Sequence, residues 1–227
     1  MTHSLEKLIT KIPKVLFSKE SWKTLGEYVG LGRPVENTPI DNVSALKNFI
    51  ETRSSHVSQT ALYGYLKTRA GTQFPAMFDD PGLLISINIA KWQVYLGCLS
   101  DLSVYLGALV CLRTDAGSDE ISDLFSQVIK EITDQTGIPD EASDEFPDTV
   151  KALIIRVANA DYAGIPDDET AFSVSPDMLF HWAPIADELK NRDRVIVKNS
   201  IRFRWKDIRI SARSLLDAEA LIKSTRN

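Results

Sequence analysis

The sequence predicts an all-α fold with about seven to nine helices around one core. Apolar residues recur at helical spacing in several long segments. Glycine and proline stand mainly at the ends of those segments, where they stop or start helices. The chain has 227 residues, of which 44% are hydrophobic, so it can bury a sizeable core.

Residues 1–29 predict two short amphipathic helices that are separated near Pro13. The first has an apolar face with lysines on its other sides. The apolar residues are Leu5, Leu8, Ile9, Ile12 and Leu16, and the lysines are Lys7, Lys11 and Lys14. Such a segment either packs on the core as a surface helix or lies on an anionic membrane surface.

Two long helices are expected next, at 42–70 and 83–113. Gly71 stands where a glycine commonly ends a helix, and Asp80-Pro81-Gly82 indicates a turn or a helix start. Residues 74–81 connect the two helices, so we expect them to pack antiparallel. The second of them is the long central apolar helix of the predicted fold.

The central apolar helix also has the composition of a membrane span. Residues 94–112 carry a single charge, Asp101, and are strongly apolar. A central aspartate disfavours insertion into a bilayer, and a small or polar face beside a bulky one favours a helix buried among others. The sequence leaves both a buried core helix and a single membrane span open.

Further helices are expected at 118–137, 147–162 and 176–182, followed by a long C-terminal helix at 192–223. Ser175 and Pro176 are typical of a helix cap and a first helical position. Two segments rich in acidic residues and proline, 138–148 and 165–175, indicate loops.

In one stretch of the predicted C-terminal helix, the sequence pattern also fits a strand. Residues 201–206 alternate as a strand does, but the longer window has helical spacing, so we predict a helix. Its apolar residues then form two stripes. The first is Val197, Ile201, Trp205, Ile208, Ala212 and Leu215, and the second is Ile196, Phe203, Ile210 and Leu221. Such a helix must either lie between other helices or leave one stripe for a partner.

The net charge of −5 hides three blocks of different sign. Residues 1–114 hold 12 basic and 9 acidic residues, residues 115–191 hold 4 and 18, and residues 192–227 hold 10 and 4. The acidic middle and the basic end either neutralise each other or leave one of them for a charged partner. We expect a partner-binding basic face on the C-terminal helix, formed by Lys198, Arg202, Lys206, Arg209 and Arg213.

Domain organisation and compartment are indicated only coarsely. Residues 1–114 and 115–227 are expected to form two helical halves or one continuous domain. The chain starts without a signal-peptide pattern. Cys98 and Cys111 are too far apart on one helix to form a disulfide, and unpaired cysteines suit a reducing compartment. We therefore expect a cytoplasmic protein.

The sequence contains no recognised catalytic or cofactor-binding motif. It contains no nucleophile elbow, phosphate-binding loop, dinucleotide fingerprint or zinc-ligand spacing. The acidic loops lack the residue order of an EF-hand. We expect no catalytic residue, no metal site and no cofactor, and a pI near 5.3 disfavours nucleic acid as a partner.

The leading hypothesis is a non-enzymatic cytoplasmic helical protein that binds another protein or further copies of itself, as an adaptor, assembly factor or complex subunit. One alternative is an enzyme or small-ligand binder with a pocket between helices near Phe180, His181 and Trp182. A second alternative is a peripheral membrane protein that uses the N-terminal lysines and the basic C-terminal helix.

Overall fold

The computed structural model describes residues 38–226 of the chain. Within that range the fold is all-α, as predicted, and contains seven α-helices and no strand. The helices predicted for residues 1–29, with Lys7, Lys11 and Lys14, lie outside the described residues. Within the described residues, contacts between helices cross the position near residue 114, for which the sequence left two helical halves or one continuous domain open.

The two long helices of the first half occur as predicted. Helix α3 spans Val43–Ala70, and helix α4 spans Pro81–Arg113. Asn42 caps α3 by accepting a hydrogen bond from the amide of Ala45, and Asp80 caps α4 in the same way. Gly71 ends α3 with a φ of 53°, a left-handed conformation that favours glycine. Two short 3₁₀ turns, η2 (Gly71–Gln73) and η3 (Pro75–Phe78), connect the helices.

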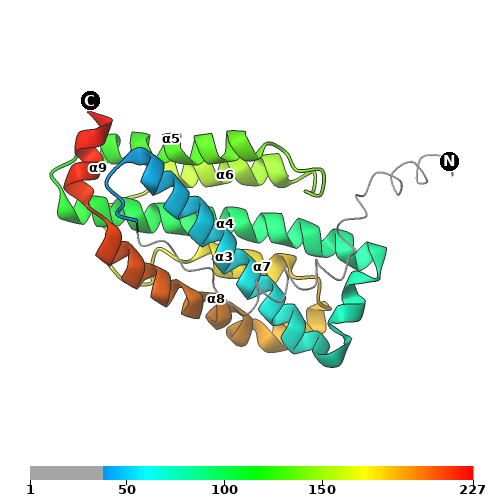
Figure 1. Ribbon diagram of the computed structural model, residues 1–227. Coiled ribbons are helices and arrows are strands. Elements are labelled where there is room, and N and C mark those ends of the chain that lie inside the picture. Colours follow the sequence, from blue (N-terminus) through cyan, green and yellow to red (C-terminus); the bar gives the residue numbers. More distant parts are fainter. Residues whose placement is uncertain (1–37, 227) are drawn as a thin grey trace. The chain divides into compact units, whose positions relative to one another are not determined.

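Helix α4 is the centre of the fold (Figure 1). Helices α3, α5, α6 and α7 all pack against it. By length and composition α4 could cross a membrane, but 94% of its most apolar window is buried inside the protein. The predicted small and polar face of this helix therefore contacts other helices, which approach it closely.

The helices after α4 cover its sides. Helix α5 spans Ser118–Thr136, helix α6 spans Phe146–Ala158, and the two pack on each other as well as on α4. Helix α6 ends four residues earlier than the prediction that extended it to Tyr162. The Tyr162 side chain folds back instead, and its hydroxyl donates a hydrogen bond of 2.7 Å to the carbonyl of Val157.

Helix α7 spans Val174–Trp182 and begins two residues earlier than predicted. Ser175 was expected to cap it, but the helix already includes Val174 and Ser175. Both of their amides donate hydrogen bonds to Asp101 of α4. The cap of α7 therefore comes from a different helix, which local sequence patterns cannot indicate.

The predicted helix at 192–223 is in fact two helices. Helix α8 spans Asp187–Leu215 and helix α9 spans Ala218–Thr225. The break occurs because the backbone at Leu216 pairs with Ile40: the Ile40 amide donates to the Leu215 carbonyl, and the Asp217 amide donates to the Ile40 carbonyl. The side chain of Asp217 then caps α9. The helix prediction for 201–206, against a strand, is confirmed.

The close approach of Tyr162 to α4 requires glycine at position 107. A Cβ atom there would lie 2.2 Å from a ring carbon of Tyr162, whose side chain is fully buried. We expect Gly107→Ala to destabilise the fold by about 1 to 3 kcal/mol, the range for overpacking a core. Urea denaturation measures this, with Gly117→Ala as the control because its Cβ would meet no atom within 4 Å. An unchanged midpoint in Gly107→Ala would contradict the packing described here.

Candidate functional site

Helix α8 lies along one edge of the bundle (Figure 1). One side of it packs against α3 and α7. The first predicted apolar stripe accounts for this contact, since Val197, Ile201, Trp205, Ile208 and Ala212 are buried. Polar contacts fix the side towards α3: Arg204 donates hydrogen bonds to the hydroxyl and carbonyl oxygens of Thr60, and Asp193 pairs with Arg69.

The other side of α8 leaves large apolar side chains in solvent. They are Leu189, Ile196, Phe203 and Ile210, with exposed fractions of 40, 66, 77 and 53%. They recur every seven residues, which places them on one side of a helix. We call these four residues the α8 apolar stripe. The fourth member of the second predicted stripe, Leu221, is buried in α9 instead.

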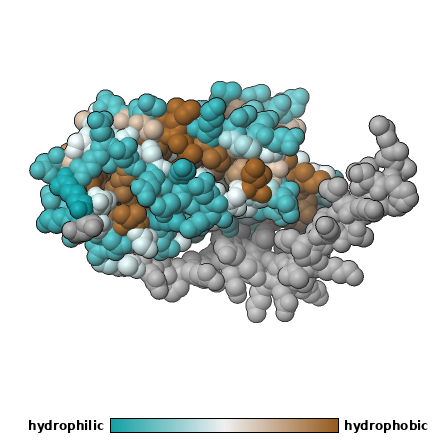
Figure 2. Space-filling view, turned by 90° about the horizontal axis from the view of Figure 1, so that it is seen from above, coloured by the Kyte–Doolittle hydropathy of each residue, from teal (hydrophilic) through white to brown (hydrophobic). Residues whose placement is uncertain are grey.

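Single exposed apolar residues are normal on a protein surface, whereas a contiguous row of them indicates an interaction site. The other large apolar residues that are exposed within residues 38–226 are spread over α4, α6, α8 and a loop: Ile85, Leu112, Ile138, Ile155 and Val195. On the face drawn in Figure 2, the apolar areas are separate and lie among hydrophilic surface. The α8 apolar stripe therefore differs from the rest in its regular spacing along one helix.

The five cations predicted for the basic face do not share one environment. Lys198 pairs with Asp177 of α7, and Arg213 pairs with both carboxylate oxygens of Asp167 at 2.8 and 2.9 Å. Both aspartates belong to the acidic middle block of the sequence. The ion pair between Arg226 and Glu120 also joins these blocks. Part of the charge asymmetry is thus neutralised within the chain.

The remaining cations of the predicted face are not neutralised in this way. Arg202 and Lys206 are exposed, and within residues 38–226 neither forms an ion pair. Arg209 is half-buried, and its Nε has no hydrogen-bond partner among the described residues. Arg192 is likewise exposed without an ion pair in the described part of the chain. Arg192 and Lys206 lie three or four residues from members of the α8 apolar stripe, Arg202 directly precedes Phe203, and we call these three residues the basic flank. The exposed Asp207 lies beside Lys206, between Phe203 and Ile210.

Below this surface, Trp205 joins α8 to α7. Its indole Nε1 donates a hydrogen bond of 3.1 Å to the hydroxyl oxygen of Ser175. Its ring stacks on Phe172 with centroids 4.6 Å apart. Trp205 is fully buried, so α8 cannot rotate about its axis without breaking these contacts.

Ser175 is in turn held by Asp101, a fully buried carboxylate in the middle of α4. Asp101 accepts hydrogen bonds from the amides of Val174 and Ser175, at 3.1 and 2.7 Å. It also accepts one from Nη1 of Arg156 at 2.9 Å, which forms an ion pair between α4 and α6. The amides lie at the N-terminus of α7, where the helix dipole favours a negative charge.

Burial raises the pKa of the Asp101 carboxyl above its usual range. Arg156 and the hydrogen bonds from residues 174 and 175 oppose that increase. The arrangement therefore compensates a buried charge with one cation and two amides. The sequence contained one signal for it, an aspartate within an apolar helix, but no signal for its partners.

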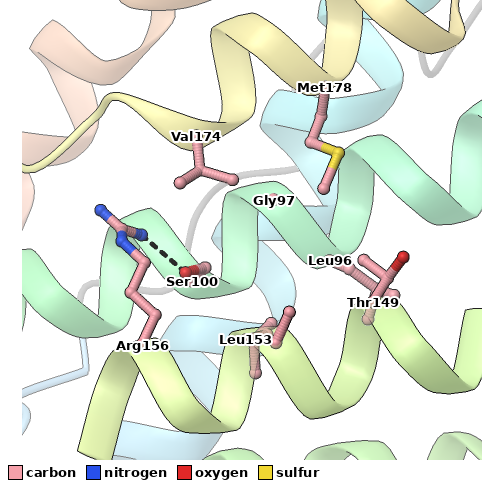
Figure 3. Close-up of a pocket in the computed structure, with 9 residues that line it drawn as sticks. Leu96, Gly97, Ser100, Thr149, Leu153, Arg156, Val174 and Met178 are labelled. Carbon is pink, nitrogen blue, oxygen red and sulfur yellow. Dashed lines mark hydrogen bonds between the residues drawn. The ribbon is translucent and has the colours of Figure 1, made fainter. Parts of the chain in front are cut away.

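A small cavity of about 120 Å³ lies beside this network, between α4, α6 and α7 (Figure 3). Within the described residues, its lining includes Arg156 and Met178 but none of the residues predicted to line a pocket. Phe180 lies below the cationic groups of Arg194 and Lys198, at 4.6 and 6.0 Å from its ring centroid. His181 is exposed and contacts the edge of Trp182.

Residues 38–226 contain no group of three or more His, Cys, Asp or Glu side chains that could hold a metal ion. Cys98 and Cys111 are both free, and burial raises the pKa of the Cys98 thiol. The chain matches no protein-family model, and no curated protein or solved structure matches it.

The Asp101 network predicts a large effect of Asp101→Asn. The amide group keeps the size of the side chain but leaves Arg156 without its counterion and turns one hydrogen-bond acceptor into a donor. We expect a loss of about 3 kcal/mol in unfolding free energy, near the lower end for a broken buried pair because Arg156 is 27% exposed.

Asp177→Asn is the matched control, since Asp177 is exposed and also pairs with a cation. We expect it to cost about 0 to 1 kcal/mol, as for surface ion pairs. Chemical denaturation of both variants measures the difference. An equal loss of unfolding free energy in both variants would show that Asp101 stabilises the fold no more than a surface ion pair does.

Proposed function

We propose that this chain is a cytoplasmic, non-enzymatic protein-binding module that holds a partner on the solvent-facing side of α8, as an adaptor, assembly factor or complex subunit. The observation that carries the proposal is the α8 apolar stripe, four large side chains exposed at a spacing of seven residues. The free cysteines Cys98 and Cys111 support a reducing compartment.

The spacing of the stripe suits a helical partner. Two helices that pack side by side contact each other through two positions of each seven-residue repeat, and the α8 apolar stripe supplies one of the two. Burying one such side chain contributes about 1.5 to 3 kcal/mol before the entropic cost of association. Phe203 is the most exposed member and lies in the second half of α8, so it is the expected centre of the binding energy.

The basic flank indicates the charge of the partner. Arg192, Arg202 and Lys206 stand beside the stripe without ion pairs in residues 38–226. A second copy of this chain would bring the same three cations to the interface. We therefore propose an acidic amphipathic helix as the partner, with carboxylates beside its apolar face.

The stripe is tested with the double variant Ile196→Glu/Phe203→Glu. Full-length chain captures its partner from cells, and the identified partner is then purified and titrated by calorimetry. We expect binding to weaken about 100-fold or more, because two central apolar contacts become buried charges.

Ile155→Glu is the control, since Ile155 is 51% exposed but lies on α6. It should bind as the unchanged chain does. Native mass spectrometry that finds only a monomer in cells, or equal binding by both variants, would overturn the proposal.

The charge of the partner is tested with Arg202→Glu/Lys206→Glu. We expect binding to be about tenfold weaker at low ionic strength, with the difference shrinking near 1 M salt because exposed charges are then screened. Lys151→Glu on α6 is the control, as Lys151 is also exposed. A salt-independent affinity, or a partner helix without acidic residues, would contradict this part of the proposal.

An anionic membrane is the other class of surface that could take an apolar stripe with a basic flank. Sedimentation with phosphatidylserine vesicles distinguishes it from a protein partner. We expect no binding that depends on the residues of the α8 apolar stripe. Binding that is lost in Ile196→Glu/Phe203→Glu would replace the protein partner with a membrane.

A further inference from the structure

A buried arginine on α3 has no counterion in the described part of the chain. Only two charged side chains are buried there, Asp101 and Arg53. Asp101 is paired with Arg156, whereas no nitrogen of Arg53 forms a hydrogen bond or an ion pair within residues 38–226. Arg53 is only 8% exposed, and its guanidinium carbon lies 5.1 Å from the centroid of the Phe49 ring. A charge in this position is costly unless an anion joins it.

Arg204 brings a second guanidinium from α8 to α3, against which α8 packs. It donates hydrogen bonds to the hydroxyl and carbonyl oxygens of Thr60 at 3.0 and 2.9 Å, and to the carbonyl of Ser200 at 2.9 Å. These acceptors are uncharged, and two of its five N–H groups take no part in the three bonds. A Cβ atom on Gly64 would lie 2.9 Å from Nη2 of Arg204, so glycine there lets the guanidinium lie against α3.

His56 lies between the two guanidinium groups along α3. It follows Arg53 by three residues and precedes Thr60 by four, which places these three residues in one row on the helix. Its side chain is exposed. Burial lowers the pKa of His56, and the positive charges of Arg53 and Arg204 lower it further, so both guanidinium groups act on the imidazole. We call Arg53, His56 and Arg204 the α3 basic site.

No carboxylate within residues 38–226 pairs with the α3 basic site. The acidic residues in neighbouring turns are Glu51 on α3 and Asp207 on α8, which are exposed and form no ion pair in this range. Burial lowers the pKa of both Arg53 and Arg204, and no carboxylate opposes that decrease. The site thus holds positive charge and unused donors, and an anion is the partner that it lacks.

The donors of the site suit a phosphate group. A phosphate monoester carries nearly two negative charges at neutral pH and three acceptor oxygens, whereas a carboxylate carries one charge and two oxygens. The forked guanidinium of Arg53 can bind two of those oxygens, and a protonated His56 can bind another. We propose that Arg53, His56 and Arg204 bind the phosphate group of a phosphate monoester, which supplies the negative charge that this side of α3 lacks.

Inorganic phosphate is the probe that tests the site in the full chain, with sodium chloride added to keep the ionic strength constant. The chain has three histidines, His3, His56 and His181. We expect the imidazole NMR signal of His56 to shift in a saturable way with phosphate. The pKa of His56 should rise in the complex, because a bound anion favours the protonated ring. The signal of His181, which is exposed on α7, should not saturate.

Arg53→Met removes the unpaired charge and keeps an apolar side chain of similar length. We expect it to weaken phosphate binding at least about tenfold. Arg53→Lys retains the charge, so it tests the site even if Arg53→Met folds poorly, and it should bind several times more weakly because an ammonium lacks the forked donors. Lys67→Met is the matched control, since it removes an exposed positive charge from the other end of α3 and should leave the affinity unchanged.

The phosphate monoester could belong to a soluble molecule or to a lipid headgroup. Glycerol 3-phosphate and vesicles that contain phosphatidic acid present the two sources. Because Arg53 is almost closed off from solvent, we expect glycerol 3-phosphate to shift His56 as phosphate does, without sedimentation of the chain with the vesicles. Sedimentation that is lost in Arg53→Met would support the same site with a lipid as the source.

Two results would overturn the proposal. A His56 signal in the unchanged chain that does not saturate with phosphate or glycerol 3-phosphate, without sedimentation on the vesicles, would show that the site binds no phosphate group. Equal affinities in Arg53→Lys, Lys67→Met and the unchanged chain would show that Arg53 does not hold it. Neither result bears on the α8 apolar stripe.

Discussion

The carboxylate of Asp101 is the constraint on which the arrangement of the helices depends. A charge in the middle of the most apolar helix is costly to bury unless it is paired and hydrogen-bonded. Asp101 meets this requirement with Arg156 from α6 and with two amides from the start of α7. One carboxylate thereby fixes three helices relative to each other.

The effect of this network extends to the surface through Ser175 and Trp205. The amide of Ser175 binds Asp101, and its hydroxyl accepts the indole hydrogen of Trp205 on α8. Because Trp205 must face inward, residues on the other side of α8 must face outward. The exposure of Phe203 and its neighbours thus follows from a polar contact in the core as well as from the helical period.

Local signals predicted the fold class and many of the helix ends. Asn42 and Gly71 bound α3, Asp80 caps α4, and Gly137 ends α5, all as short-range patterns indicate. The predicted helix boundaries are wrong where contact with a distant segment of the chain determines where a helix begins or ends. The break at Leu216 depends on pairing with Ile40, and the start of α7 depends on Asp101, 73 residues away from Val174.

The candidate site was predicted in part, for the same reason. Helical spacing identified Ile196, Phe203 and Ile210, but it missed Leu189, which lies before the predicted start of the helix at residue 192. It also could not show which stripe is buried or that Leu221 belongs to another helix. The distribution of charged residues along the sequence identified the acidic and basic blocks. Only the fold shows that Asp167 and Asp177 neutralise Arg213 and Lys198, while Arg202 and Lys206 remain in solvent.

Native-state hydrogen exchange in Asp101→Asn tests most directly whether the buried carboxylate orders the surface helix. If Asp101 acts through Ser175 and Trp205, amide exchange will accelerate in the first turn of α7 and in α8 around Trp205. Protection in α5, which makes none of these contacts, will change much less. Equal acceleration in all helices, or unchanged exchange in α8, would contradict the account.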